Sequence, residues 1–173
     1  VFEEAGVLLG TRAGAPLPSD FMDSEAAHIR SRLHDRSDAF DWRPWLTEHE
    51  ITLSVAQLGV ASRWVTPKME PRRYDTWFYR AVAPTDQVPD HDGVEMSDSM
   101  WVTPSAALAS ADAGEVAVMP PTRVNLEALQ AFGSAEEAAA APDGSGEAIL
   151  PVMEVRGEEI WVTHPSIGEL RVR

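Results

Sequence analysis

Hydrophobic side chains recur at helical spacing in the segment that follows Pro18. We expect a helix that Ser19 or Asp20 caps and that runs to about Arg36. The residues 10–18 before it are rich in Gly, Pro and Ala, which predicts a loop. The buried stripe of the helix would consist of Phe21, Ile29 and Leu33.

Between residues 38 and 57 the apolar positions follow no single period, and tryptophan occurs twice. This pattern indicates short helical turns packed under aromatic rings. A helical segment of this kind could shape a ligand pocket or act as a lid, and plain added packing is an equally good interpretation.

Alternating side chains predict two strands, Gly59 to Thr66 and Tyr74 to Ala83. Both faces of the second strand carry large residues, so we expect it to be central in its sheet or covered. A hairpin is predicted near the C-terminus, with one strand from Leu150 to Val155 and the other from Ile160 to Thr163.

Capping residues mark three helices in the second half of the chain. Thr103-Pro104 combines a hydroxyl N-cap with proline at the first helical position, and Gly114 lies just past the expected end. Thr122 would cap a second helix that runs to Phe132. A short alanine-rich helix is predicted within 134–142, where serine begins it and proline stops it.

The chain begins with Val1-Phe2-Glu3-Glu4-Ala5-Gly6-Val7, in which acidic residues follow an apolar residue that cannot cap a helix. This arrangement predicts the end of a helix whose first part precedes residue 1. Gly6 suits the left-handed residue that closes a last turn. The heptad resembles the end of the Nudix box, with Glu3 and Glu4 in the places of its acid pair. Adjacent glutamates are also typical of a solvated helix face.

Further short motifs follow in an order that resembles one branch of the Nudix family. This branch includes the peroxisomal coenzyme A diphosphatase and its bacterial relatives, and in it a long insertion separates the box from the later motifs. The motifs are Arg63-Trp64-Val65-Thr66-Pro67, the segment Pro71–Tyr79, Met100-Trp101-Val102-Thr103-Pro104 and Pro120-Pro121-Thr122-Arg123.

The resemblance implies an α/β fold, a Nudix-like α/β/α sandwich with a mixed sheet. The N-terminal strands and the first half of the Nudix helix would be missing, and the chain by itself would then be inactive. We expect a single domain over residues 1–173, the usual size for one domain. A helical insertion would occupy 11–58, and the remaining sheet, helices and hairpin would occupy 59–173.

The resemblance also implies a pyrophosphohydrolase dependent on Mg²⁺ or Mn²⁺, which cleaves a nucleoside diphosphate linked to another moiety, such as coenzyme A or acyl-CoA. Glu3 and Glu4 would be its catalytic residues and metal ligands, since hard cations prefer oxygen ligands. Glu95 is a further candidate ligand, in a segment 94–96 that we expect to begin an edge strand. Isolated loop glutamates are more often simply solvated.

Arg72 and Arg73 stand at the entrance of the second predicted strand. A guanidinium group there could hold a phosphate of the substrate. Salt bridges are the simpler interpretation, because the chain has 28 acidic and 14 basic residues.

The net charge of −14 argues against nucleic acid or an anionic membrane as the partner. No apolar run approaches the roughly 20 residues needed to span a bilayer. The chain has no cysteine for disulfides or thiolate metal sites, and its five histidines lack the spacing of a helical zinc site. We expect a small-molecule diphosphate as the partner and a cytoplasmic location, with a leader before residue 1 and a homodimer left open.

Two other classes of function stay open. One is a Nudix-fold module that binds a nucleotide, or is regulated by it, without hydrolysing it. The residue just before Val1 would distinguish that module from an enzyme. The other is a protein-interaction scaffold, which the Ala- and Glu-rich region 134–148 would suit and which would show no metal dependence.

Overall fold

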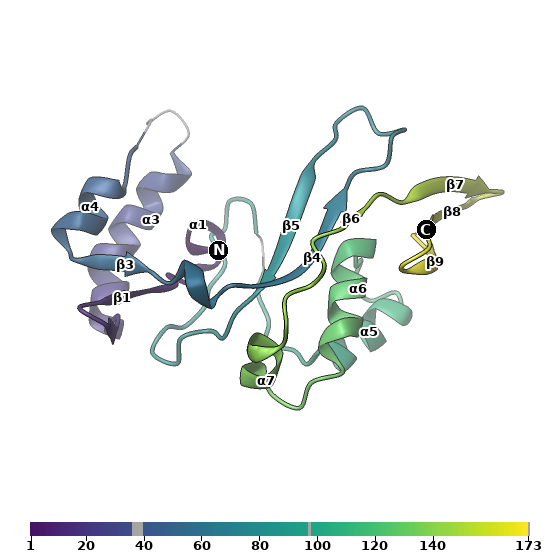
Figure 1. The fold of residues 1–173 in the computed structure, drawn as a ribbon. Helices are drawn as coiled ribbons and strands as arrows, with labels where there is room; N and C mark the ends of the chain where they lie inside the picture. The colour runs from purple at the N-terminus through teal and green to yellow at the C-terminus, as the bar shows by residue number, and fades with distance from the viewer. Residues whose placement is uncertain (36–39, 97, 173) are drawn as a thin grey trace. The chain divides into compact units, whose positions relative to one another are not determined.

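A computed structural model describes residues 1–35, 40–96 and 98–172 of the chain (Figure 1). The chain forms two compact units. Unit 1 comprises Val1–Gln57 and Val82–Trp101, and unit 2 comprises Leu58–Ala81 and Val102–Arg173. Unit 1 is therefore made of two segments that 24 residues of unit 2, Leu58–Ala81, separate in the sequence.

Unit 1 consists of short helices and a small antiparallel sheet. Its helices are α1 (Phe2–Ala5), α2 (Ser19–Phe21), α3 (Ala27–His34) and α4 (Arg43–Glu48). A π-helical turn, Met22–Ala26, makes α2 and α3 one continuous helix, and a 3-10 turn covers Val55–Gln57. The strands β1 (Gly10–Arg12), β2 (Ala15–Pro16) and β3 (Ile51–Leu53) lie in the order β2-β1-β3.

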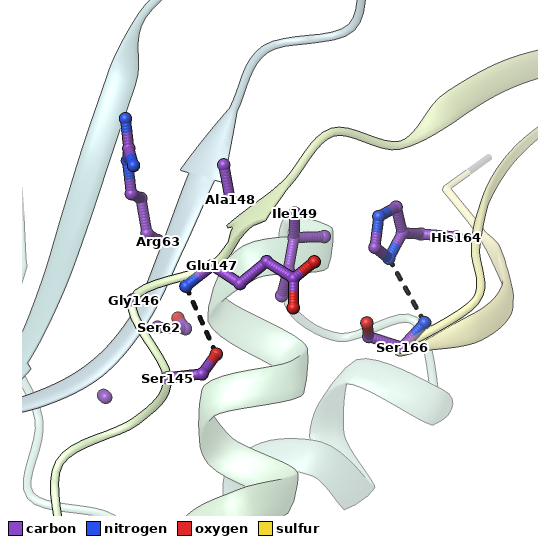
Figure 2. A pocket seen from close by; sticks show the side chains of 10 residues that line it. Ser62, Arg63, Ser145, Gly146, Glu147, Ala148, Ile149, His164 and Ser166 are labelled. Carbon is purple, nitrogen blue, oxygen red and sulfur yellow. Dashed lines mark hydrogen bonds between the residues drawn. The ribbon is translucent and has the colours of Figure 1, made fainter.

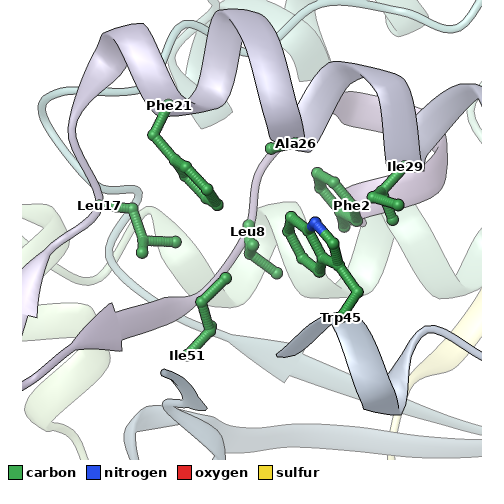
Figure 3. Packing of buried hydrophobic residues seen from close by; sticks show 8 residues of the cluster. All are labelled: Phe2, Leu8, Leu17, Phe21, Ala26, Ile29, Trp45 and Ile51. Carbon is green, nitrogen blue, oxygen red and sulfur yellow. The ribbon is translucent and has the colours of Figure 1, made fainter. Parts of the chain in front are cut away.

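The core of unit 1 gathers apolar side chains from the helices and from β3 (Figure 3). The ring of Phe21 stacks on that of Trp45 with their centroids 5.7 Å apart, and Leu8 lies between them and β3 with 2% of its surface exposed. Burying a side chain of this size stabilises the fold by roughly 1.5–3 kcal/mol. The members of the cluster are Phe2, Leu8, Leu17, Phe21, Ala26, Ile29, Trp45 and Ile51.

Gln87 ties the second segment of unit 1 to the first. Its side-chain oxygen accepts a hydrogen bond from the Leu8 N–H at 2.9 Å, and its side-chain nitrogen donates to the Leu8 carbonyl oxygen at 3.0 Å. Gln87 is 7% exposed, so both backbone groups of Leu8 are paired away from water. The side-chain amide of Gln87 thus pairs with the N–H and the carbonyl oxygen of Leu8, as the backbone of a neighbouring strand would.

Unit 2 contains two sheets. In the first, β4 (Gly59–Val65) is antiparallel to β5 (Asp75–Arg80) and parallel to β6 (Ala148–Ile149), which makes the sheet mixed. The second is the antiparallel meander β7 (Val152–Arg156), β8 (Glu159–His164) and β9 (Gly168–Arg171). No helix in the described ranges is long and apolar enough to cross a membrane.

The helices of unit 2 are α5 (Pro104–Asp112), α6 (Pro120–Leu129) and α7 (Ala135–Ala140). Helix α6 packs against β4, where the Ser62 hydroxyl donates to the Asn125 side-chain oxygen at 2.8 Å. The loop after α7 is fixed to the same strand, because the Gly144 N–H donates to the Val60 carbonyl oxygen at 2.8 Å. A Cβ on Gly144 would lie 2.5 Å from the Ala61 carbonyl oxygen, so only glycine fits this approach.

Several expectations are confirmed. The chain is an α/β protein with a mixed sheet, and the hairpin of β7 and β8 forms near the C-terminus. Thr103 caps α5 and Ser134 caps α7, each through a hydroxyl that accepts a backbone N–H. The expected helix from Ser19 reaches His34. Its predicted last residue, Arg36, and the start of the next stretch, Asp38, lie outside the described residues.

The prediction that the second strand is central or covered is wrong. Strand β5 is at the edge of its sheet, in the order β5-β4-β6. The side chains of Trp77 and Tyr79 are 40% and 53% exposed. The Trp77 ring packs instead against Arg63, its partner on β4, whose guanidinium carbon lies 5.0 Å from the ring centroid.

Other corrections concern boundaries and caps. Segment 94–96 forms no strand, because Asp92 folds its backbone into a turn. Helix α6 begins at Pro120 rather than after Thr122, since prolines suit the first two helical positions. The long helix starts at Ser19 without a side-chain cap. The predicted loop 10–18 contains β1 and β2.

Candidate functional site

The two candidate catalytic glutamates lie on α1, in unit 1. Glu3 and Glu4 occupy its first turn, and their side chains are 44% and 53% exposed. Gly6 ends the helix in the left-handed conformation, with φ of 69°. Its N–H donates to the Phe2 carbonyl oxygen at 3.0 Å. The expectation that Gly6 closes this helix is confirmed.

Arg30, on α3, fixes the end of the helix that carries these glutamates. Its guanidinium donates to the carbonyl oxygens of Glu3, Glu4 and Asp90, each at 2.8 Å. The Asp90 N–H donates in turn to the Ala5 carbonyl oxygen at 3.1 Å. One side chain therefore satisfies the carbonyls that the short helix leaves open and holds the 82–101 segment beside it.

Replacing Gly6 by alanine is expected to destabilise this arrangement in two ways. The left-handed backbone costs an alanine about 1–2 kcal/mol, and its Cβ would lie 3.0 Å from an Nη of Arg30. Thermal unfolding of Gly6→Ala should be compared with that of Gly14→Ala. Gly14 has φ of 81° and nothing within 4 Å of the added Cβ, so it reports the backbone cost alone. Equal losses in the two variants would contradict the close fit against Arg30.

His34 lies between two carboxylates of unit 1. Its Nδ1 is 3.9 Å from Glu3 Oε1 and 3.9 Å from Asp92 Oδ2. His34 follows Arg30 by four residues, so both side chains project from one face of α3. The helix thus presents one polar group to the backbone of α1 and another to the side chain of Glu3.

Asp92 organises the turn that follows it. Its Oδ1 accepts hydrogen bonds from the N–H groups of Val94, Glu95 and Met96 at 2.8, 3.0 and 2.8 Å. The side chain is shielded from solvent, and Oδ2 has no hydrogen-bond partner among the described residues. The bond from Met96, supported by those from Val94 and Glu95, lowers the pKa of the Asp92 carboxyl, although its burial acts in the opposite direction.

A lowered pKa in the folded protein makes the Asp92 contribution depend on pH. The contribution is complete above the ordinary aspartate pKa and disappears as the pH falls through the lower folded value. We expect the melting temperature of Asp92→Asn to lie below that of the parent at neutral pH and the two to converge below about pH 4. Asp86→Asn, in the same segment, is the matched control. A gap that stays constant with pH would contradict a role for the charged form.

The other candidate residues fall in both units. Glu95 lies in the Asp92 turn, in the same unit as Glu3 and Glu4. Arg72 and Arg73 belong to unit 2, where Arg73 Nε donates to the Thr66 carbonyl oxygen at 2.9 Å. In the described part of the chain neither arginine forms an ion pair, so the salt bridges considered from the composition are not found there.

Sequence reasoning missed Arg30, His34 and Asp92. The i, i+4 spacing of Arg30 and His34, beside the apolar stripe, was the available signal for two neighbouring polar groups on one helix face. Asp92-Gly93 was readable as a turn. Their partners are up to 60 residues away in the chain, as between Arg30 and Asp90, and no local pattern indicates such a distance.

Unit 2 contains a small polar pocket of about 120 Å³ formed by β4, residues 145–149 and the β8–β9 turn (Figure 2). The Glu147 N–H donates to the Ser145 hydroxyl at 3.2 Å, and the Ser166 N–H donates to His164 Nδ1 at 3.2 Å. Both dashed bonds in Figure 2 stabilise local turns. We assign this pocket no chemistry.

The carboxylates of α1 have the chemistry of ligands for a hard cation. Oxygen donors such as Glu3 and Glu4 suit Mg²⁺ and Mn²⁺, and the shielded Oδ2 of Asp92, which accepts no hydrogen bond among the described residues, is a third oxygen in the same unit. Across 1–35, 40–96 and 98–172, however, no three His, Asp or Glu side chains are close enough to hold a metal ion together. Glu3 and Glu4 therefore fit a metal ion as two of its ligands, and further ligands would be needed to complete the site.

The crystal structure of a Nudix hydrolase from Alicyclobacillus acidocaldarius matches this structure with a TM-score of 0.63 and 26% sequence identity. The fold is similar to that of a Nudix hydrolase. The match covers 82% of this chain, which spans only 62% of the length of that Nudix hydrolase. No protein-family model matches the sequence, and no curated protein matches it. The Nudix resemblance of the sequence motifs is thus supported at the level of the fold.

Proposed function

We propose that this protein is a hydrolase that cleaves the diphosphate linkage between a nucleoside and another moiety, with Mg²⁺ or Mn²⁺ as its cofactor. One observation carries the proposal. The paired glutamates of a short helix, closed by the left-handed Gly6, are held by Arg30 in a chain whose fold is similar to that of a Nudix hydrolase. The resemblance of the motifs points to coenzyme A or acyl-CoA as the substrate.

In this proposal Glu3 and Glu4 are the catalytic residues, and both would bind the metal. A divalent cation bound there would supply positive charge for the phosphate oxygens and an acidified water. Arg30 keeps the two glutamates in place through their own carbonyl oxygens. His34 Nδ1 lies 3.9 Å from the Glu3 carboxylate, and the Asp92 carboxylate lies 3.9 Å from the same nitrogen. Glu95 is a further candidate ligand next to Asp92.

Arg72 and Arg73 are the candidate phosphate-binding residues. Two observations support them. An arginine without an ion-pair partner can bind a phosphate without first leaving a carboxylate. Basic residues are also few in a chain with a net charge of −14. Arg73 is partly committed by its bond to the Thr66 carbonyl oxygen, which leaves Arg72 as the freer of the two.

A second candidate is a module that binds a nucleotide without hydrolysing it. The absence of a complete metal-binding group among the described residues favours it. In that case Glu3 and Glu4 would form a solvated helix face, and a ligand would bind without turnover.

Hydrolysis of diphosphate compounds by the protein is the test. We would measure phosphorylated products from coenzyme A, acyl-CoA, NADH, ADP-ribose and nucleotide sugars, each with and without Mg²⁺ or Mn²⁺. Turnover of one class that stops when EDTA is added and returns with the metal would support the hydrolase and identify its substrate. Saturable binding of a nucleotide with no turnover would move the protein to the binding module.

A further inference from the structure

Unit 2 contains a cavity of about 410 Å³ that is open to solvent, and its volume is within the range of about 300–1,000 Å³ typical of small-molecule sites. Its walls come from β4, β5, the start of α6 and the meander of β7 to β9. Most of its lining is aliphatic or aromatic, with two methionines that can adapt to different shapes. The apolar walls include Trp64, Phe78, Met119, Met153, Val162 and Val172.

The inner wall of the cavity offers a ligand no free hydrogen-bonding group. Trp64 and Val162 are 4% and 3% exposed. The indole N–H of Trp64 already donates to the Ser62 hydroxyl at 3.0 Å. The indole ring therefore offers the cavity only its carbon surface, and a polar ligand group would find no partner there.

The charged groups of the lining are Glu70 and Arg72, which come from the β4–β5 connection. Within the described ranges neither side chain forms an ion pair or a hydrogen bond. Glu70 is half-buried and Arg72 is exposed. Most arginines of this acidic chain bond to carboxylates or carbonyl oxygens, as Arg63 does with Asp75 and Arg80 does with Val60. Glu70 and Arg72 are two positions apart in the sequence and line the same apolar cavity with opposite charges that do not pair among the described residues, which is therefore distinctive.

We propose that this cavity binds a small molecule with an apolar chain and a zwitterionic head. The chain would occupy the space against Trp64 and Val162, the anionic part of the head would lie on Arg72, and the cationic part on Glu70. Charge complementarity favours this ligand. A purely anionic head would meet Glu70, and a purely cationic head would meet Arg72, so either would lose part of its attraction to repulsion.

Long-chain α-amino acids and phosphocholine compounds share this chemistry. The test is isothermal titration calorimetry of the whole chain with 2-aminodecanoic acid, 2-aminooctanoic acid and monomeric hexylphosphocholine. Each buried methylene should tighten binding about fourfold, so the ten-carbon amino acid should bind about sixteenfold more tightly than the eight-carbon one. Binding of the amino acids or of the phosphocholine would support the proposal and distinguish its two sources. No binding of any of them at millimolar concentration would overturn it.

The head group is tested with decanoate and decylamine, which each lack one charge, and with two variants. Both single-charge compounds should bind at least fivefold more weakly than the zwitterion. Arg72→Gln should weaken binding of the zwitterion by a similar factor. Lys68→Gln removes a positive charge from an exposed position of the same β4–β5 connection, outside the cavity lining, and should leave the affinity within twofold. Equal binding of decanoate, or equal losses in the Arg72→Gln and Lys68→Gln variants, would contradict the proposed head-group contacts.

A filled cavity provides the last check. Thr76 lines the cavity from the edge strand β5 and is exposed, so Thr76→Trp adds a residue that strands accept. We expect this variant to keep the parent melting temperature and to lose binding of the amino acid. Unchanged affinity in the folded variant would place the ligand elsewhere.

This inference does not depend on the proposed hydrolase, because it uses neither Glu3 nor Glu4. Calorimetry without metal or diphosphate tests it separately from turnover. Arg72 would be shared if both proposals hold, and a zwitterion in the cavity should then compete with the diphosphate substrate. If the zwitterion binds but does not compete with the diphosphate substrate, the proposed cavity ligand is supported and Arg72 does not bind the substrate phosphate.

Discussion

Replacing Glu3 and Glu4 together by glutamine is expected to lower kcat/KM for diphosphate hydrolysis by about 100-fold or more. Loss of an outer-shell partner at metal sites already costs about 10–100-fold, and these residues are proposed as direct ligands. The amides keep the size of the side chains but remove both negative charges. Arg30 bonds to the carbonyl oxygens of the two residues, so the helix should stay in place. Initial rates at saturating and limiting substrate would measure the effect.

The control uses another pair of adjacent glutamates in the first turn of a helix, Glu136 and Glu137 of α7. Their double glutamine variant changes the net charge by the same amount and should keep parental turnover. A loss of activity in both double variants would indicate a general effect of charge. Full activity in the Glu3→Gln, Glu4→Gln variant would remove these residues from the catalytic machinery.

Replacing Gln87 by leucine should cause the largest loss of stability. It would remove both hydrogen bonds to Leu8 and leave a buried N–H and a buried carbonyl unpaired. Each unsatisfied buried group costs about 1–3 kcal/mol, so we expect a loss of about 2–6 kcal/mol in the free energy of unfolding of unit 1. Urea unfolding followed by tryptophan fluorescence would measure it, because Trp42 and Trp45 belong to this unit.

Gln57→Leu is the matched control, since the same substitution is made at an exposed position of the same unit. Its midpoint in urea should stay close to that of the parent. If Gln87→Leu unfolds at the same urea concentration as Gln57→Leu, the Leu8 pairing does not hold the two segments together.

Local chemistry was readable from the sequence where one or two neighbouring residues decide the structure. Gly6 ends α1 because a residue without Cβ adopts φ of 69° without strain and leaves room for Arg30. Thr103 caps α5 because its hydroxyl reaches an N–H three residues later. The apolar stripe at 3.6-residue spacing placed Phe21 and Ile29 in the core. Each of these signals is contained within one or two turns of the chain.

Features set by distant partners could not be read in this way. Strand β6 has two residues and exists only because it pairs with β4, whose partner residues lie 85 positions earlier. Large residues on both faces of β5 predicted that other elements cover both of its sides. The order of strands depends on the whole unit, however, and β5 lies at the edge of its sheet. The candidate site shows the same limit, since Glu3 and Glu4 were identifiable and Asp92 beside His34 was not.

The pairing of Gln87 with Leu8 also sets an order of events during synthesis. These residues are 79 positions apart, so at 5–20 residues per second the ribosome adds Gln87 roughly 4–16 s after Leu8. Until then the Leu8 backbone lacks the side chain that pairs both its N–H and its carbonyl oxygen. The first segment of unit 1 therefore cannot complete its core around Leu8 during these seconds, although its own residues have already been synthesised.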